Sequence, residues 1–331
     1  MWAMDPWIVI TVEIANPILF FFSRLLMTAV VPSPLRYAYY PGCVAQGACR
    51  ELYDSTDQIA RHLGIELVEL EAASCCGSGT FKEESELLED TVNARNLALA
   101  EALGLPMLTH CSTCQGVLGR VNEKLKAAKT ANPEYFHQVQ ALCQKGGCES
   151  CYQGTGDVRH LLWVLAHDYG LERLAQQVKR PLLGLRCAAF YGCYLLRAYD
   201  ISRFDVARDP RLMEDLFERL GATPVWYRGR TQCCGWPISS YAPQQSFSMA
   251  GRHLLEAIEA GADCLVTPCP LCHLNLDSRQ PEVEEVIGRK LGIPILHLPQ
   301  LVGLALGIPA KNLGLNRHVV QVERALQKIG R

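Results

Sequence analysis

The chain has 331 residues, 49% of them hydrophobic, and is long enough to bury the cores of two domains of ordinary size. Its 32 Lys and Arg residues nearly balance 34 Asp and Glu residues, which gives no reason to expect nucleic acid as a partner. Sixteen cysteines in a long chain without a secretory signal favour thiolates held for metal in a reducing compartment over secreted disulfides.

Residues 1–35 form an apolar N-terminal extension. The run 7–31 is apolar enough to suggest a membrane span, but Glu13, Pro17 and Arg24 interrupt it. No basic residues precede this run as they would in a signal peptide. We expect an interfacial anchor, a poor transmembrane helix, or an artefact of start-site choice with translation beginning at Met27.

The first half alternates strand-like and helical segments. Strands are expected over 35–40, 65–70 and 105–109, and helices after each of them, the second over 83–103. Cysteines follow each strand directly, and in an open α/β sheet the carboxyl ends of parallel strands share one edge, where ligands bind. The cysteines at this predicted edge are Cys43, Cys75, Cys76, Cys111 and Cys114.

The second half repeats the plan. Its strands are expected within 182–191 and over 223–227, 263–267 and 293–298, with helices over 210–220, 244–260 and 300–306. The first-half counterpart of its last strand and helix is 157–165. The cysteines at the strand ends are here Cys193, Cys233, Cys234, Cys269 and Cys272.

The sequence therefore predicts an α/β protein with two similar domains, each a mostly parallel sheet flanked by helices. We place the first domain at 36–180 and the second at 181–331. Residues 131–156 lack a clear period and are expected to form an insertion or linker loop. This stretch also contains Cys143, Cys148 and Cys151.

The ten strand-end cysteines form one pattern written twice. In each copy a single cysteine precedes Cys-Cys-Gly, which precedes Cys-x-x-Cys. The first gap spans 31 residues in one copy and 39 in the other, and the second gap spans 34 in both. Five thiols repeated in order, with one gap identical, strongly indicate paired metal sites.

Thiolate sulfur suits zinc or iron–sulfur clusters. Adjacent cysteines such as Cys75 and Cys76 point in divergent directions along an extended backbone, so they chelate one small ion poorly. They reach two irons of a larger cluster more readily. The alternative is zinc held by four of the five thiols in at least one half, because softness alone does not separate zinc from iron.

The repeated pattern, together with the phrases YYPGC, CCG, LGLNRH and LVGLALG, resembles the tandem cysteine-rich CCG domains of the B subunit of heterodisulfide reductase. The resemblance implies two non-cubane 4Fe-4S clusters that face each other across the domain interface. All ten positions at which the family has cluster-binding cysteines are cysteines in this chain. Within the family, the first motif and its surroundings look closest to the branch that serves as membrane-associated subunit of an unusual succinate:quinone reductase.

Other residues are weaker candidates for a functional role. Cys143, Cys148 and Cys151 begin a ferredoxin-like pattern that lacks a clear fourth member, so we expect loop cysteines or a peripheral zinc set. Cys49 and Cys264 are expected to be small core residues. The weak catalytic candidates, as proton donors beside the Cys-x-x-Cys pairs, are His110 and His273.

We expect an oxidoreductase subunit that is active within a complex, because no glycine fingerprint for a nicotinamide or flavin follows the first strand. Electrons would come from iron–sulfur and flavin partner subunits and pass through the two clusters to a quinone or a disulfide. The expected location is the cytoplasm, with peripheral contact at the cytoplasmic face of a membrane. The alternative function is a non-catalytic, zinc-stabilised scaffold subunit.

Overall fold

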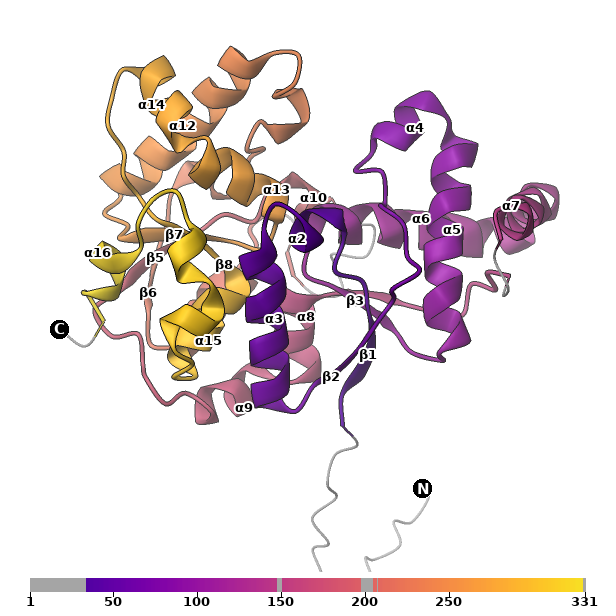
Figure 1. The fold of residues 1–331 in the computed structure, drawn as a ribbon, viewed down its shortest axis with the longest axis horizontal. Coiled ribbons are helices and arrows are strands. Elements are labelled where there is room, and N and C mark those ends of the chain that lie inside the picture. The colour runs from indigo at the N-terminus through magenta and orange to yellow at the C-terminus, as the bar shows by residue number, and fades with distance from the viewer. Residues whose placement is uncertain (1–33, 148–150, 198–204, 207, 330–331) are drawn as a thin grey trace, which may run out of the picture. The chain divides into compact units, whose positions relative to one another are not determined.

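The computed structural model describes residues 34–147, 151–197, 205–206 and 208–329, and residues 35–331 belong to one compact unit. This unit contains two four-stranded sheets whose strand pairs are all parallel (Figure 1). The first has the order β2-β1-β3-β4, formed by β1 (Arg36–Tyr39), β2 (Glu66–Glu69), β3 (Met107–Thr109) and β4 (Val158–His160). The second has the order β6-β5-β7-β8, formed by β5 (Arg186–Ala189), β6 (Thr223–Val225), β7 (Cys264–Thr267) and β8 (Ile295–His297). The predicted fold class is confirmed.

Helices connect the strands of both halves. In the first half they are α2 (Cys43–Gln46), α3 (Arg50–Leu63), α4 (Thr80–Glu84), α5 (Glu86–Ala102), α6 (Ser112–Ala131), α7 (Pro133–Lys145), α8 (Leu161–Trp163), the π-helical turn η1 (Val164–Asp168) and α9 (Leu171–Gln176). In the second half they are α10 (Cys193–Leu196), α11 (Leu212–Arg219), η3 (Arg228–Thr231), η4 (Trp236–Ile238), α12 (Pro243–Glu259), α13 (Pro270–His273), the π-helical turn η5 (Leu274–Ser278), α14 (Gln280–Ile287), α15 (Leu298–Ala305), η6 (Ala310–Leu313), η7 (Leu315–Arg317) and α16 (Glu323–Leu326).

The helix expected over 83–103 is divided in two at Ser85. This residue has extended backbone angles, and its hydroxyl accepts a hydrogen bond from the amide of Leu88 at 3.3 Å. Serine at this position satisfies one of the free amides of a helix start, so α4 ends and α5 begins here. The long apolar pattern conceals this N-cap.

The expectation of a loop across 131–156 is wrong for its first part, which forms helix α7. Asn132 caps the helix by accepting a hydrogen bond from the amide of Tyr135 at 3.2 Å, and Pro133 occupies the first turn. Phe136, Val139 and Cys143 are buried at helical spacing, and α7 packs against α5. The apolar stripe is only one residue wide, which makes its period hard to recognise in the sequence.

The two halves share one core. Helix α3 of the first half packs against α15 of the second, and the two lie side by side left of the centre of Figure 1. Ile59 and Leu63 of α3 belong to the same buried cluster as Leu301 and Leu304 of α15. The relative position of the two sheets is therefore set by close packing and not by a flexible linker.

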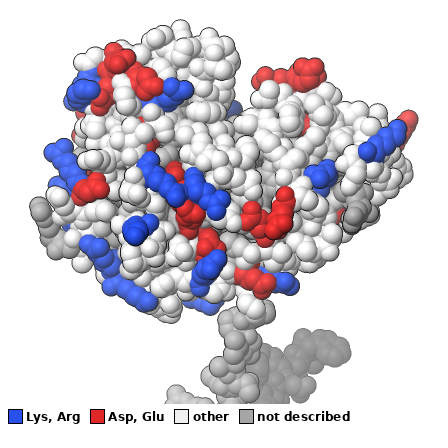
Figure 2. Space-filling view, viewed as in Figure 1, with Lys and Arg blue, Asp and Glu red and all other residues white. Residues whose placement is uncertain are grey.

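Charged side chains of both signs are scattered over the face in Figure 2, as the balanced composition predicts. The same view shows the surface hollowed between the part formed by α12 and α14 and the part formed by α4. Among the described residues, no helix has the length and apolar character needed to cross a membrane. The predicted extension over 1–35 lies outside the described residues except for its last two.

Candidate metal centre

The ten repeated cysteines lie at the carboxyl ends of strands, as predicted. In the first sheet the strand order reverses between β1 and β3, and Cys43 and Cys111 follow these two neighbouring strands. Such a reversal opens a crevice at the sheet edge. Cys75 and Cys76 reach the same edge from the loop after β2, and the second sheet, with the equivalent order, repeats the arrangement.

In the first half the sulfur atoms approach each other in pairs. Cys43 Sγ lies 3.4 Å from Cys75 Sγ, and Cys76 Sγ lies 3.5 Å from Cys114 Sγ. Cys111 Sγ accepts a hydrogen bond from the amide of Cys114 at 3.4 Å. Among the described residues, two groups of side chains have donor atoms that all lie within 4.8 Å of one another, as a single metal ion requires. Neither group contains any of the ten repeated cysteines. The paired spacing suits a cluster of several metal atoms better than one ion.

The second half has the same contacts. Cys193 is hydrogen-bonded to Cys233, and Cys234 to Cys272, which matches the two pairs of the first half. Backbone amides also point at the sulfurs: Gly235 donates to Cys233 Sγ at 3.5 Å and Trp236 to Cys234 Sγ at 3.4 Å. Amide hydrogen bonds of this kind stabilise thiolate charge and tune metal-bound sulfur.

At least one thiol in each half favours the thiolate form. The hydrogen bond from Cys43 places the pKa of Cys75 well below its usual range, with a further contribution from the amide of Gly77. The hydrogen bond from Cys193 likewise lowers the pKa of Cys233. Because the thiolate is the form that binds metal, both positions can act as ligands at neutral pH.

Two glycines keep space open beside the sulfurs. Gly42 and Gly192 precede the first cysteine of each motif and have φ values of 76° and 73°, which favour glycine. A Cβ atom at Gly42 would lie 3.1 Å from Cys114 Sγ, and one at Gly192 would lie 3.0 Å from Cys272 Sγ. A side chain at either position would crowd that sulfur, so glycine leaves both sulfurs free to bind a metal group.

The two cysteine sites meet at the boundary between the halves. Thr113 Oγ1 lies 3.4 Å from Cys269 Sγ, and a hydrogen bond between Cys111 and Cys269 lowers the pKa of Cys269. Ser112 binds the carbonyl of Pro268 through its amide at 3.3 Å and its hydroxyl at 3.0 Å. The Cys-x-x-Cys segment of each motif therefore lies against that of the other.

A cleft of about 380 Å³ opens beside this boundary. Tyr194 crosses it, because its hydroxyl donates to the carbonyl of Ser78 at 3.1 Å. Among the described residues that line it, the only charged side chain is Glu83, and no Lys, Arg or His is present. The remaining polar lining consists of Ser78, Thr80, Ser112, Thr113, Tyr194, Ser239, Ser240 and Tyr241. The sequence interpretation did not identify these residues, although Tyr194 directly follows Cys193.

His110 and His273 do not line the cleft. His110 is buried, with Nδ1 2.8 Å from Thr56 Oγ1 and Nε2 3.0 Å from the carbonyl oxygen of Pro41. Burial lowers its pKa to about 3. Both nitrogens are thus engaged in holding α3 and the loop after β1. His273 is buried beside His297 and His318.

The other cysteines separate into different surroundings. Cys143 is buried in α7 and donates to the carbonyl of Thr91 at 3.2 Å, and Cys151 Sγ lies 2.7 Å from Gln144 Nε2. Cys148 lies outside the described residues. Cys264 is buried in β7 with its sulfur 3.7 Å from that of Cys187, which agrees with a core role. Cys49 is also buried, but it lies among polar ligand-type side chains.

The fold and the site define a protein of two tandem cysteine-rich α/β domains whose thiol sites adjoin. A family model described as the CCG cysteine-rich domain matches residues 37–119 and again 187–277. The chain therefore belongs to the CCG cysteine-rich family, which includes the B subunits of heterodisulfide reductases, and the resemblance noted from the sequence is confirmed.

Similar proteins support this membership. The 8-methylmenaquinol:fumarate reductase membrane anchor subunit of Wolinella succinogenes is 41% identical over 87% of this chain and 98% of its own length. The B subunit of a ferredoxin/F(420)H(2)-dependent CoB-CoM heterodisulfide reductase from Methanosarcina acetivorans is 32% identical over 89% of this chain and 97% of its own length. These relatives are subunits of redox enzymes, and this chain is accordingly an iron–sulfur redox subunit.

One solved structure has the same fold. A hypothetical protein from Helicobacter pylori superposes with a TM-score of 0.69 at 19% identity. The match covers 87% of this chain and about half, 52%, of the Helicobacter pylori chain. At this identity the likeness concerns the fold alone.

Proposed function

We propose that each five-cysteine set binds one 4Fe-4S cluster of the non-cubane type. The first would be held by Cys43, Cys75, Cys76, Cys111 and Cys114, and the second by Cys193, Cys233, Cys234, Cys269 and Cys272. Paired sulfurs at 3.4 and 3.5 Å, amides directed at sulfur and glycines that keep the space open all support this assignment. Bound clusters supply one-electron transfer. Zinc in one half remains the alternative.

The protein's own residues bring the two centres together. Thr113 and Ser112 bind the second motif across the boundary between the halves, and these contacts join buried segments. The cleft borders Thr113, Cys269 and Cys272, so an acceptor bound in it would lie next to the boundary. We infer that electrons enter from iron–sulfur and flavin partner subunits and leave to an acceptor in this cleft.

A quinone fits the cleft better than an anionic disulfide. Its described lining offers hydroxyl groups from serine, threonine and tyrosine, which can donate hydrogen bonds to quinone carbonyls. Anionic ligands are usually held by arginine or lysine, and the described lining has neither. This absence of basic side chains is the observation that carries the choice. Reduction of a quinone to the quinol consumes two electrons and two protons; bound clusters would supply the electrons one at a time, and water in the open cleft would supply the protons.

The binding of a quinone requires access to lipid, so we place the protein at the cytoplasmic face of a membrane as a peripheral subunit. The name of the Wolinella succinogenes relative, a membrane anchor subunit of an 8-methylmenaquinol:fumarate reductase, supports attachment to a membrane and a quinone–quinol couple as redox partner, although the quinol is the electron donor in that enzyme. Recovery of the complex from native membranes tests the location. Co-purification of a flavoprotein that oxidises succinate or reduces fumarate would support the quinone branch, whereas co-purification of a flavin-containing heterodisulfide reductase subunit would support the disulfide branch.

The decisive experiment is anaerobic purification of the complex, followed by iron analysis and EPR of oxidised and reduced samples. We expect two distinct cluster signals. Replacement of Cys76 by Ser should remove one signal and replacement of Cys234 by Ser the other, while the unaltered half stays folded. Addition of a menaquinone analogue should change the line shape of at least one signal. Colourless protein with stoichiometric zinc and no iron would establish the scaffold alternative instead.

A further inference from the structure

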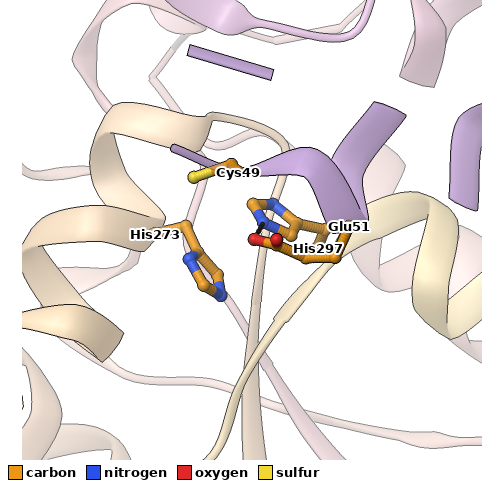
Figure 3. Close-up of side chains that lie close together, drawn as sticks. All are labelled: Cys49, Glu51, His273 and His297. Carbon is orange, nitrogen blue, oxygen red and sulfur yellow. Dashed lines mark hydrogen bonds and ion pairs between the residues drawn. The ribbon is translucent and has the colours of Figure 1, made fainter. Parts of the chain in front are cut away.

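A second group of ligand-type side chains lies apart from the ten repeated cysteines (Figure 3). It consists of Cys49 and Glu51 at the start of α3, His273 at the end of α13, and His297 at the end of β8. One donor atom from each side chain lies within 4.8 Å of those from the other three, and all four residues are buried. Two of the four belong to each half of the molecule.

The buried carboxylate of Glu51, next to the thiol of Cys49, needs a compensating positive charge. Glu51 Oε1 lies 3.1 Å from His297 Nε2, and the carboxylate also has the buried thiol of Cys49 as a close neighbour. A carboxylate taken out of water is costly unless it is paired or coordinates a metal. A divalent cation bound to one thiolate, one carboxylate and two neutral imidazoles makes a site with no net charge, which suits a buried position.

His273 has the hydrogen bonds of a metal-binding imidazole. Its Nε2 lies 3.1 Å from the carbonyl oxygen of Ile295 and can donate to it, while its Nδ1 is buried without a hydrogen-bond partner. Histidines that bind metal usually donate the other ring N–H to a carbonyl or carboxylate in this way. In the tautomer that donates this hydrogen bond, the proton is on Nε2, and the lone pair of Nδ1 is available for an ion.

Asp277 and His318 support this arrangement from outside. His318 Nδ1 lies 3.0 Å from His273 Nε2, and Asp277 accepts hydrogen bonds from the amides of Val319 and Val320 at 2.9 and 3.3 Å. His273, Asp277 and His318 also converge within 4.8 Å. Because the Asp277 carboxylate is already held by two amides, we assign this second set the supporting role.

The donor set selects the kind of ion. One sulfur, two imidazole nitrogens and one carboxylate oxygen are typical ligands of zinc, whereas calcium and magnesium take oxygen ligands. Zinc–ligand bonds of about 2.0–2.3 Å place tetrahedral ligands roughly 3.3–3.8 Å apart. The observed separations of up to 4.8 Å would therefore close by about 1 Å.

We propose that Cys49, Glu51, His273 and His297 bind a structural zinc ion that joins the two halves. The ion would connect segments that carry both cysteine sites. Cys49 follows Cys43 by six residues, and His273 directly follows Cys272. Cys49 Sγ also lies 4.0 Å from the carbonyl oxygen of Pro270, within the second Cys-x-x-Cys. A zinc ion here would hold the two cysteine sites at a constant separation.

The test is elemental analysis and zinc X-ray absorption on the full chain purified anaerobically. We expect about one zinc per chain, with one sulfur near 2.3 Å and three nitrogen or oxygen neighbours near 2.0–2.1 Å. The replacements Cys49→Ala and His297→Gln should each remove most of the zinc. Glu51→Gln, which keeps the shape of the side chain, serves as a third variant should the others fail to fold.

Matched controls come from the same fold. His160 ends β4 as His297 ends β8 and is equally buried, with its Nε2 3.1 Å from the carbonyl oxygen of Pro268, and Cys264 is a buried thiol in β7. Zinc content should be unchanged in His160→Gln and Cys264→Ala. Absence of zinc from the wild-type chain, equal zinc in all variants, or a zinc shell of three or four sulfurs would each overturn the proposal. The last outcome would place zinc in a cysteine motif.

Discussion

Thr113 of the first cysteine motif lies with its hydroxyl 3.4 Å from the sulfur of Cys269 in the second. Both residues are buried, although each also lines the cleft, so the contact is only slightly exposed to water. A hydroxyl that donates to a thiolate stabilises the negative charge of that sulfur, and this effect is one of the means by which proteins adjust cluster potentials. Through this contact, a residue of the first motif affects the surroundings of the second proposed cluster.

Replacement of Thr113 by Val should therefore lower the reduction potential of the second cluster. The change keeps the shape of the side chain and removes only the hydrogen bond. Since a hydrogen bond to a charged group contributes about 1.5–3 kcal/mol, we expect a shift on the order of tens of millivolts. Potentiometric titration followed by EPR measures it.

Thr130 provides the control for this prediction, because its hydroxyl contacts only the carbonyl of Ala127 at an exposed position in α6. The Thr130→Val variant should keep both potentials. An equal shift in the two variants, or no shift in Thr113→Val, would show that the contact with Cys269 does not influence the cluster.

Alanine at Gly42 or Gly192 should remove one cluster while leaving the other in place. The added Cβ would lie 3.1 Å from Cys114 Sγ or 3.0 Å from Cys272 Sγ and would occupy space the cluster needs. Iron content should fall by about half in each variant, if each motif holds one 4Fe-4S cluster. Iron analysis together with EPR identifies which signal is lost.

Gly170 separates this crowding from backbone strain. Its φ and ψ of 92° and 132° lie, like those of Gly42 (76° and 156°) and Gly192 (73° and 167°), in a region that only glycine adopts readily, but a Cβ at Gly170 would have nothing within 4 Å. Alanine should therefore cost about 1–3 kcal/mol of stability at all three positions. Only Gly42 and Gly192 should lose iron, and loss of iron at Gly170 would attribute the effect to strain.

His160 should make the protein less stable as the pH falls from about 6.5 to 4. Burial lowers its pKa from 6.5 to about 4, so in this range the unfolded chain binds a proton that the folded chain does not. Stability is therefore retained above pH 6.5 and lost as the pH drops, by at most about 3 kcal/mol at pH 4. Urea unfolding followed by circular dichroism at several pH values measures this loss.

The variant His160→Gln should show a shallower dependence of the urea midpoint on pH than the wild-type chain. His62 is exposed, and slight burial lowers its pKa much less than that of His160, so His62→Gln should reduce the slope much less than His160→Gln. A His160→Gln slope equal to that of the wild type would mean that His160 keeps its proton in the folded state.

Leu301 of α15 should contribute strongly to the stability of the packing between the two halves. It is fully buried in the cluster that also contains Ile59 and Leu63 of α3. Truncation to Ala should destabilise the protein by about 2–5 kcal/mol, because a buried cavity remains. The exposed Leu103 is the control, and its replacement by Ala should change stability by less than about 0.5 kcal/mol.

Much of the centre could be predicted from local signals. Each sulfur position depends on a strand, the turn after it and the next helix, and these are encoded by residues close together in the chain. The Cys-Cys-Gly and Cys-x-x-Cys groups consequently appear at the predicted sheet edges. Weak local signals led to wrong expectations in two places: Ser85, where an N-cap divides a helix, and 133–145, where a narrow apolar stripe forms α7.

The relationships between the halves were decided only by the tertiary structure. Glu51 and His297 are 246 positions apart in the chain, and nothing in the sequence near either residue points to the other. The packing of α3 against α15 brings them together and turns Cys49 from an expected core residue into a member of a polar cluster. The packing of the halves also forms the cleft and determines that its described lining has no basic side chain. Motif spacing thus determines which thiols belong together, since that depends on local chain geometry, whereas close packing between distant segments determines what lies between them.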